Sequence, residues 1–201
     1  MRVEVAATDR ATLAARLREG LQVVGTRWGG EHVMVRLEGE IVAPMERGPT
    51  HEPLPVTLRL AELPFDEGTR AAVLRVHREA FDADGSATYR YLEALPAATC
   101  WLAEADGEVV GFKMGAAKGS VVYHSHEGGV LRAQRRRGVA RALMDAQHRW
   151  AAEEGYRRVT TSTFGRFLPM LLLDLQVGFE IIGTSWVPGE AAPKLHLAKR
   201  L

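Results

Sequence analysis

The stretch VLRAQRRRGVARALM, from Val130 to Met144, reads as a β-strand that runs through a glycine turn into a helix. A helix start leaves several backbone N–H groups without intrahelical partners, and the aligned peptide dipoles place partial positive charge there. Such a start holds an anionic phosphate group without a dedicated cation, and Gly138 lets the backbone come close to that group. The stretch therefore predicts a phosphate-binding turn between a strand and a helix.

The segments around this turn show strand and helix patterns in a regular order. The Asp106-Gly107 pair supplies the positive φ angles of a tight hairpin turn, and Gly155 is the expected end of the helix that follows Gly138. From residue 56 onward the predicted order is βααβββαβαβ. Strands are expected at 56–60, 101–105, 108–116, 121–132, 157–163 and 179–187, and the other helices at 66–80, 87–95 and 166–175.

The first part of the chain predicts a separate small module. Residues 1–43 read as strand, helix, strand and strand, with Thr8 or Asp9 as the helix cap. Four prolines and a glycine then gather in residues 44–55, which favours an extended linker. We therefore expect a domain boundary there, with a second domain over residues 56–201.

Composition limits the partners and the compartment. The 26 Lys and Arg nearly balance the 25 Asp and Glu, so no strong overall field attracts nucleic acid or an anionic membrane. No apolar run approaches the roughly 20 residues of a membrane span, and no signal peptide is visible, which predicts a cytoplasmic protein. Cys100 is the single cysteine and reads as a small buried hydrophobe, so a disulfide framework is excluded.

Residues Arg135 to Ala140 fit the pattern Arg/Gln-x-x-Gly-x-Gly/Ala, which resembles the acyl-CoA pyrophosphate loop of the GNAT superfamily of N-acyltransferases. The element order over residues 56–201 resembles the fold of that superfamily as well. The resemblance implies an α/β protein of α+β type, with a mixed, mostly antiparallel sheet flanked by helices. Residues 1–43 add a βαββ-like appendage. The resemblance also implies that acetyl-CoA gives its acetyl group to a primary amine of a small molecule or peptide, by direct attack of the amine in a ternary complex.

The same resemblance implies which residues hold the co-substrate. The main-chain N–H of Val130 would face the thioester carbonyl, where a pre-aimed donor stabilises an oxyanion. The Gly128-Gly129 pair just before it favours a bulge or a close backbone approach. The expected acyl-CoA-binding residues are Val130, Leu131, Arg132, Arg135, Arg136, Arg137, Gly138, Val139, Ala140 and Arg141.

Arginines gather at this helix start, at positions 135, 136, 137 and 141. Cations are disfavoured at the positive end of the helix dipole, so their presence favours an anionic ligand. One or two guanidinium groups would meet the nucleotide phosphates in bidentate fashion. The alternative is a solvated helix start.

His124 and His126 are the candidate proton acceptors for the attacking amine. Two residues apart on a strand, they share a face, and the unperturbed pKa of an imidazole lies near neutral pH. Their position relative to the glycine turn is similar to that of the histidine pair in arylalkylamine N-acetyltransferases. The alternative is that they are packed or surface histidines. A zinc site with Glu127 is disfavoured, because Glu127 points to the opposite strand face unless a bulge turns it, so no metal is expected.

Two residues depart from the family pattern. Asp174 stands where many members carry the tyrosine that protonates the leaving thiolate, and Phe167 replaces an expected asparagine. Asp174 is thus a candidate catalytic residue that is protonated, points away or has another task. The departures support an alternative function, a non-catalytic acyl-CoA sensor whose N-terminal module binds a partner or ligand. That module could instead extend the sheet or build a homodimer contact.

Overall fold

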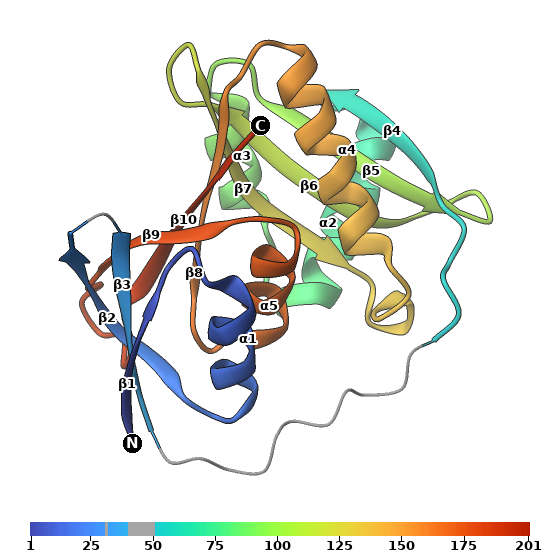
Figure 1. Cartoon of the computed structure of the whole chain (residues 1–201). Coiled ribbons are helices and arrows are strands. Elements are labelled where there is room, and N and C mark those ends of the chain that lie inside the picture. The colour runs from blue at the N-terminus through green and yellow to red at the C-terminus, as the bar shows by residue number, and fades with distance from the viewer. Residues whose placement is uncertain (31, 40–50) are drawn as a thin grey trace. The chain divides into compact units, whose positions relative to one another are not determined.

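The computed structural model describes residues 1–30, 32–39 and 51–201, and these form two compact units (Figure 1). One unit comprises Met1–Arg47 and Thr160–Arg200, and the other comprises Gly48–Val159 with Leu201. The boundaries expected at 43 and 55 stay predictions, and most of the 44–55 linker lies outside the described residues.

The unit Gly48–Val159 is built on four antiparallel strands joined mainly by hairpins. The strands are β4 (Thr57–Glu62), β5 (Thr99–Ala105), β6 (Glu108–Ala117) and β7 (Val122–Val130). The helices are α2 (Glu67–Phe81), α3 (Ser86–Glu93), the short 3₁₀ turn η1 (Arg132–Gln134) and α4 (Val139–Glu153).

Helices α2 and α4 cover opposite faces of these strands (Figure 1). A Cβ atom on Gly111 of β6 would lie 3.1 Å from Val139 of α4. A Cβ atom on Gly129 of β7 would instead lie 3.0 Å from Ala80 of α2. Between the helices and the sheet lies a core that includes Val76, Leu102, Phe112, Met114 and Leu143.

The ladder between β6 and β7 contains one irregularity that matters for the site. Met114 pairs with Glu127, whereas the next residue, Gly115, pairs with Ser125. His126 is therefore the extra residue of a β-bulge, a feature that re-aims the side chains around it. Close backbone approach follows at Gly128, where a Cβ atom would lie 2.9 Å from the carbonyl oxygen of Phe112.

The other unit contains the N-terminal elements and the C-terminal part of the chain. Its elements are β1 (Arg2–Ala6), α1 (Arg10–Arg18), β2 (Gln22–Gly29), β3 (His32–Glu38), α5 (Leu168–Gln176), β9 (Glu180–Ser185), β10 (Lys194–Arg200) and most of β8 (Arg158–Phe164). Asp9 caps α1 by accepting from the Thr12 N–H, and the Thr12 side chain, together with that N–H, lowers the pKa of its carboxyl group. Helix α1 packs on α5, and β2 packs near β9.

Among the described residues, the strands form a sheet of order β1-β3-β2 and a sheet of order β4-β5-β6-β7-β8-β10-β9. This arrangement confirms the predicted α+β class with a mostly antiparallel sheet and a βαββ appendage. The N-terminal strands build their own sheet and do not extend the larger one. Strand β10 was missed by the sequence reading, although Leu195 and Leu197 alternate there as buried residues. No helix in the described parts of the chain is long and apolar enough to cross a membrane.

Candidate active site

The glycine loop, residues 131–138, connects β7 to α4 and leaves the start of α4 open. Gly138 is the N-cap of α4 with φ of 84°, a conformation that favours glycine. Within the described residues no side chain caps this helix start, and no atom lies within 4 Å of where a Gly138 Cβ would be. The first-turn N–H groups therefore stay available for an anion.

Arg132 anchors the glycine loop to the end of α2. Its backbone N–H donates to Glu79 Oε1 at 2.7 Å, and its guanidinium donates to Asp82 Oδ2 at 2.6 Å. The two acidic residues therefore neutralise an arginine of the loop.

Arg135 and Arg137 also point back into the protein. Arg135 donates to the carbonyl oxygens of Val130 and Ala80, at 3.3 and 3.1 Å. Arg137 donates to Gln134 Oε1 at 2.7 Å. Their guanidinium groups hold the shape of the loop by satisfying carbonyl and amide oxygens.

Arg136 and Arg141 are the other two arginines of this cluster, and both are exposed. In the part of the chain that the structure describes, Arg136 has no ion-pair or hydrogen-bond partner, and its φ is 64°. Arg141 lies 3.7 Å from Asp145, one turn further along α4. An exposed pair of this kind is weak, so both guanidinium groups are free to meet an anion.

The loop contacts predict that Arg135 and Arg136 have separable roles. Arg135→Ala should lower the free energy of unfolding by about 1–2 kcal/mol, because two carbonyl groups lose a charged donor. Arg136→Ala should leave that free energy within about 0.5 kcal/mol and weaken acetyl-CoA binding instead. Urea denaturation and calorimetric titration of both variants would check this. A stability loss for Arg136→Ala equal to that of Arg135→Ala would contradict the assignment.

The end of β7 presents backbone donors on the side away from β6. The Leu131 N–H donates to the Val110 carbonyl of β6 at 3.0 Å. Because successive residues of an antiparallel strand alternate their hydrogen-bonding direction, the N–H groups of Val130 and Gly128 point away from β6. The Val130 carbonyl accepts from Arg135 on that side.

His124 and His126 lie together on the face of β7 that α3 covers. Their ring centroids are 4.4 Å apart at 85°, and the His126 ring is 5.7 Å from the ring of Tyr91 on α3. Both side chains are half-buried. The structure therefore brings the two predicted histidines into one aromatic group, and their role in proton transfer stays a prediction.

Glu127 is a site residue that the sequence reading set aside. The bulge at His126 turns it to the face of α2, where its Oε2 lies 3.2 Å from Nε2 of His77. Burial raises the pKa of Glu127, and the opposing effects of His77 and Lys113 are smaller. The sequence offered one signal for this pair, His77 on the apolar face of the 66–80 helix. Its partner Glu127 lies 50 residues further along the chain, so no local pattern joins the two.

Asp174 belongs to α5 in the other compact unit, and its side chain is 1% exposed. Its catalytic role stays a prediction. Cys100 is fully buried, and burial raises the pKa of its thiol, so it is not a nucleophile. Across residues 1–30, 32–39 and 51–201, no three His, Cys, Asp or Glu side chains gather as a metal site.

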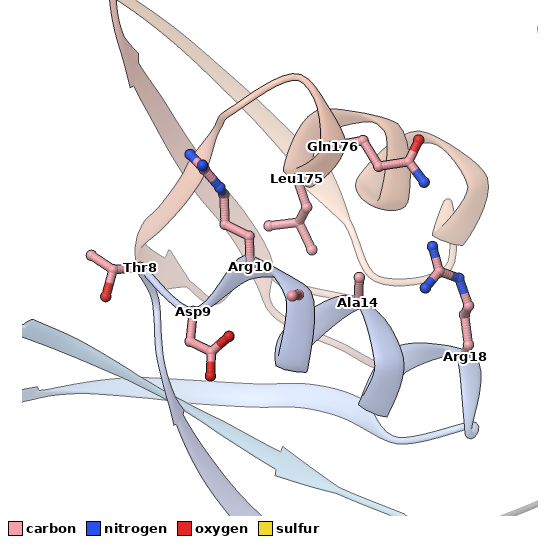
Figure 2. Close-up of a pocket in the computed structure, with 8 residues that line it drawn as sticks. Thr8, Asp9, Arg10, Ala14, Arg18, Leu175 and Gln176 are labelled. Atoms are coloured by element: carbon pink, nitrogen blue, oxygen red, sulfur yellow. The ribbon is translucent and has the colours of Figure 1, made fainter.

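A pocket of about 500 Å³ lies between α1 and α5 in the unit that contains the N-terminus (Figure 2). Arg10 at its wall donates to the Gly178 carbonyl, and Asp9 caps α1. These charged groups already serve the backbone of the unit. The pocket is lined by Thr8, Asp9, Arg10, Ala11, Ala14, Arg18, Leu175 and Gln176.

Comparison with known proteins agrees with this geometry. Residues 70–166, which include α2, β7 and the glycine loop, match the acetyltransferase (GNAT) family. The matched segment is an acetyltransferase domain of the GNAT type. No curated protein sequence matches the chain significantly.

Solved structures share the fold at low identity. A GCN5-related N-acetyltransferase from Kribbella flavida is 25% identical, with a TM-score of 0.56 over 72% of this chain and 98% of that one. A GNAT family acetyltransferase from Elizabethkingia anophelis, solved with acetyl-CoA bound, is 16% identical, with a TM-score of 0.57 over 73% and 98%. The aminoglycoside 6′-N-acetyltransferase from Enterococcus faecium is 13% identical, with a TM-score of 0.59 over 72% and 96%.

Proposed function

We propose that this protein transfers an acetyl group from acetyl-CoA to a primary amine of a small molecule or peptide, by direct attack in a ternary complex. The observation that carries the proposal is the uncapped start of α4 at Gly138, one short loop after a strand in which the Val130 and Gly128 N–H groups point away from β6. Among the described residues, no side chain competes for the donors of this helix start.

The residues of the glycine loop fit the co-substrate. The first N–H groups of α4 would hold the pyrophosphate, with Arg136 and Arg141 meeting its charge. The Val130 N–H would donate to the thioester carbonyl and stabilise negative charge on its oxygen during attack. Gly128 offers a second N–H on the same side of the strand, two residues earlier.

The distance along β7 from Val130 differs between the two candidate histidines. A strand rises about 3.3 Å per residue, so His124 lies roughly 20 Å along β7 from Val130, and His126 roughly 13 Å. Neither imidazole spans that distance by itself. We propose that His126, the nearer one, relays protons between the site and solvent through ordered water, with His124 next to it in ring contact.

Asp174 is the candidate for returning a proton to the coenzyme A thiolate, because it occupies the position of the family tyrosine. A carboxyl group donates a proton to a thiolate in its neutral form, whereas an ionised carboxylate repels the anion. Asp174→Asn keeps the shape of the side chain and removes the acidic proton.

The acceptor is proposed to be an amine because the structural relatives include an aminoglycoside 6′-N-acetyltransferase. The chemical test is a screen of polyamines, arylalkylamines, aminoglycosides and peptides with acetyl-CoA, read by mass spectrometry. We expect one class to gain a single acetyl group, with release of one free thiol for each product. Binding of acetyl-CoA without any acetylated product across the panel would overturn the proposal of amine transfer.

A further inference from the structure

We infer that Glu127, oriented by His77, accepts the proton that the attacking amine must lose. This inference rests on the proposed acetyl transfer and assigns its general base. A primary amine is an ammonium ion near neutral pH and has no lone pair until a proton leaves.

The β-bulge places Glu127 for this task. Without the extra residue at His126, the alternation of the strand would turn Glu127 to the face of α4. With it, Glu127 shares the face of α2 and α3 with the two β7 histidines. Bulges recur next to active sites because they re-aim a side chain in this way.

His77 meets Glu127 with a defined nitrogen. Its Nδ1 lies 3.1 Å from the carbonyl oxygen of Ala83, which accepts a hydrogen bond, so Nδ1 carries hydrogen. Nε2 therefore faces Glu127 Oε2 at 3.2 Å. The imidazole thus acts as a positioning residue for the carboxylate.

The surroundings hold the imidazole in place. Its ring lies 4.8 Å from the ring of Phe81 and stacks on Phe112 at 6.2 Å. On another side, a Cβ atom on Gly85 would lie 2.5 Å from the imidazole. The side chain of His77 is 8% exposed, whereas that of Glu127 is 25% exposed. The carboxylate therefore has one buried oxygen toward His77 and remains partly accessible to an acceptor.

Glu127 is also better placed along β7 than either histidine. It lies three residues from Val130, roughly 10 Å, and directly precedes Gly128 with its outward N–H. The charged or titratable groups that act on it are His77 on α2 and Lys113 on β6. The rings of Tyr91 on α3 and of the two β7 histidines contact one another on the same face of the sheet. Lys113 and His77 both favour the ionised carboxylate, the form that accepts a proton.

The proposed step balances as follows. The ammonium gives one proton to the Glu127 carboxylate, and the freed lone pair forms a bond to the acetyl carbon. The carbon–sulfur bond then breaks, and the second proton of the nitrogen passes to the departing thiolate to give the thiol. Glu127 afterwards releases its proton to solvent.

The test compares Glu127→Gln, His77→Gln and the control Glu104→Gln, a half-buried glutamate of β5 paired with Arg59. With the best amine of the panel, Glu127→Gln should lower kcat on the order of 100-fold and leave acetyl-CoA binding unchanged. His77→Gln should move the acid limb of the kcat profile to higher pH, because the carboxylate keeps its burial and loses its stabilising partner. Glu104→Gln should match the wild type.

A readout without turnover separates this inference from the proposed function. Since burial raises the folded-state pKa of Glu127, its ionisation costs stability as pH rises, and Glu127→Gln lacks that cost. The melting temperature of Glu127→Gln relative to wild type should therefore increase as pH rises above the ordinary carboxyl pKa of 4.5 and the folded-state carboxyl ionises. If the wild type is active and Glu127→Gln has the same kcat and pH profile, the inference about Glu127 is overturned and the proposed function stands. Absence of wild-type turnover would overturn the proposed function.

Discussion

Gly138→Asp is expected to lower the affinity for acetyl-CoA by on the order of 100-fold while the protein stays folded. The variant places a carboxylate at the helix start that should hold the pyrophosphate. Two like charges about 5 Å apart at an effective dielectric constant of about 20 repel by about 3 kcal/mol. Folding should survive, because a Gly138 Cβ would meet no atom of the described residues within 4 Å, and Asp tolerates a positive φ.

Gly138→Asn is the matched control, since Asn also tolerates a positive φ and has nearly the same shape without the charge. Calorimetric titration of acetyl-CoA into wild type, Gly138→Asn and Gly138→Asp separates the two contributions. The Asn variant measures the steric cost, and the further loss in Gly138→Asp measures the charge. Equal affinities for the three proteins would remove the glycine loop from the binding site.

Gly115→Ala is expected to destabilise the protein by about 2–3 kcal/mol. A Cβ atom at this position would lie 2.4 Å from the ring of Tyr123 and 2.7 Å from the carbonyl oxygen of His124. The ring is fully buried and its hydroxyl hydrogen-bonds Thr99 at 2.7 Å, so it has little room to yield. Overpacking of a core usually costs this much. The strain also falls at the register shift that sets the bulge at His126.

Gly183→Ala in β9 is the control, because no described atom lies within 4 Å of its Cβ position. Urea denaturation followed by tryptophan fluorescence should give Gly183→Ala within about 0.5 kcal/mol of wild type. A Gly115→Ala variant of wild-type stability would show that β7 can shift relative to β6. In that case the position of the bulge would not be set by close packing.

The local elements of this chain could be predicted because their signals lie within a few residues of each other. Asp66 caps α2 through the Thr69 N–H, and Asp106-Gly107 adopts the positive φ angles of its turn. Gly138 likewise lies at the predicted turn into α4. Strand β10 was not predicted, because its short alternating run, between Pro193 and the last residue, carries no cap or turn signal of comparable strength.

The arginine cluster shows where such reasoning ends. The family resemblance and the charge of the cluster assigned the guanidinium groups of the glycine loop to a phosphate ligand, and that assignment stays a prediction. In the structure Arg132 and Arg135 also donate to oxygens at the end of α2, some 50 residues earlier in the chain. The choice between ligand and protein oxygen depends on which acceptors folding brings within reach, and no local pattern contains that information.

By itself the sequence determined the order of strands and helices around the glycine turn, because caps, turn residues and periodicity act over one or two helical turns. Tertiary structure alone decided the direction of Glu127. The one extra residue at His126 shifts the alternation of β7, so that Glu127 lies on the face opposite to the one that regular alternation would give it. Strands β6 and β7 approach each other closely at Gly115 of β6 and at Gly128 of β7, on either side of this shift. The pairing of Glu127 with His77 follows from this register, since it joins two segments far apart in the chain.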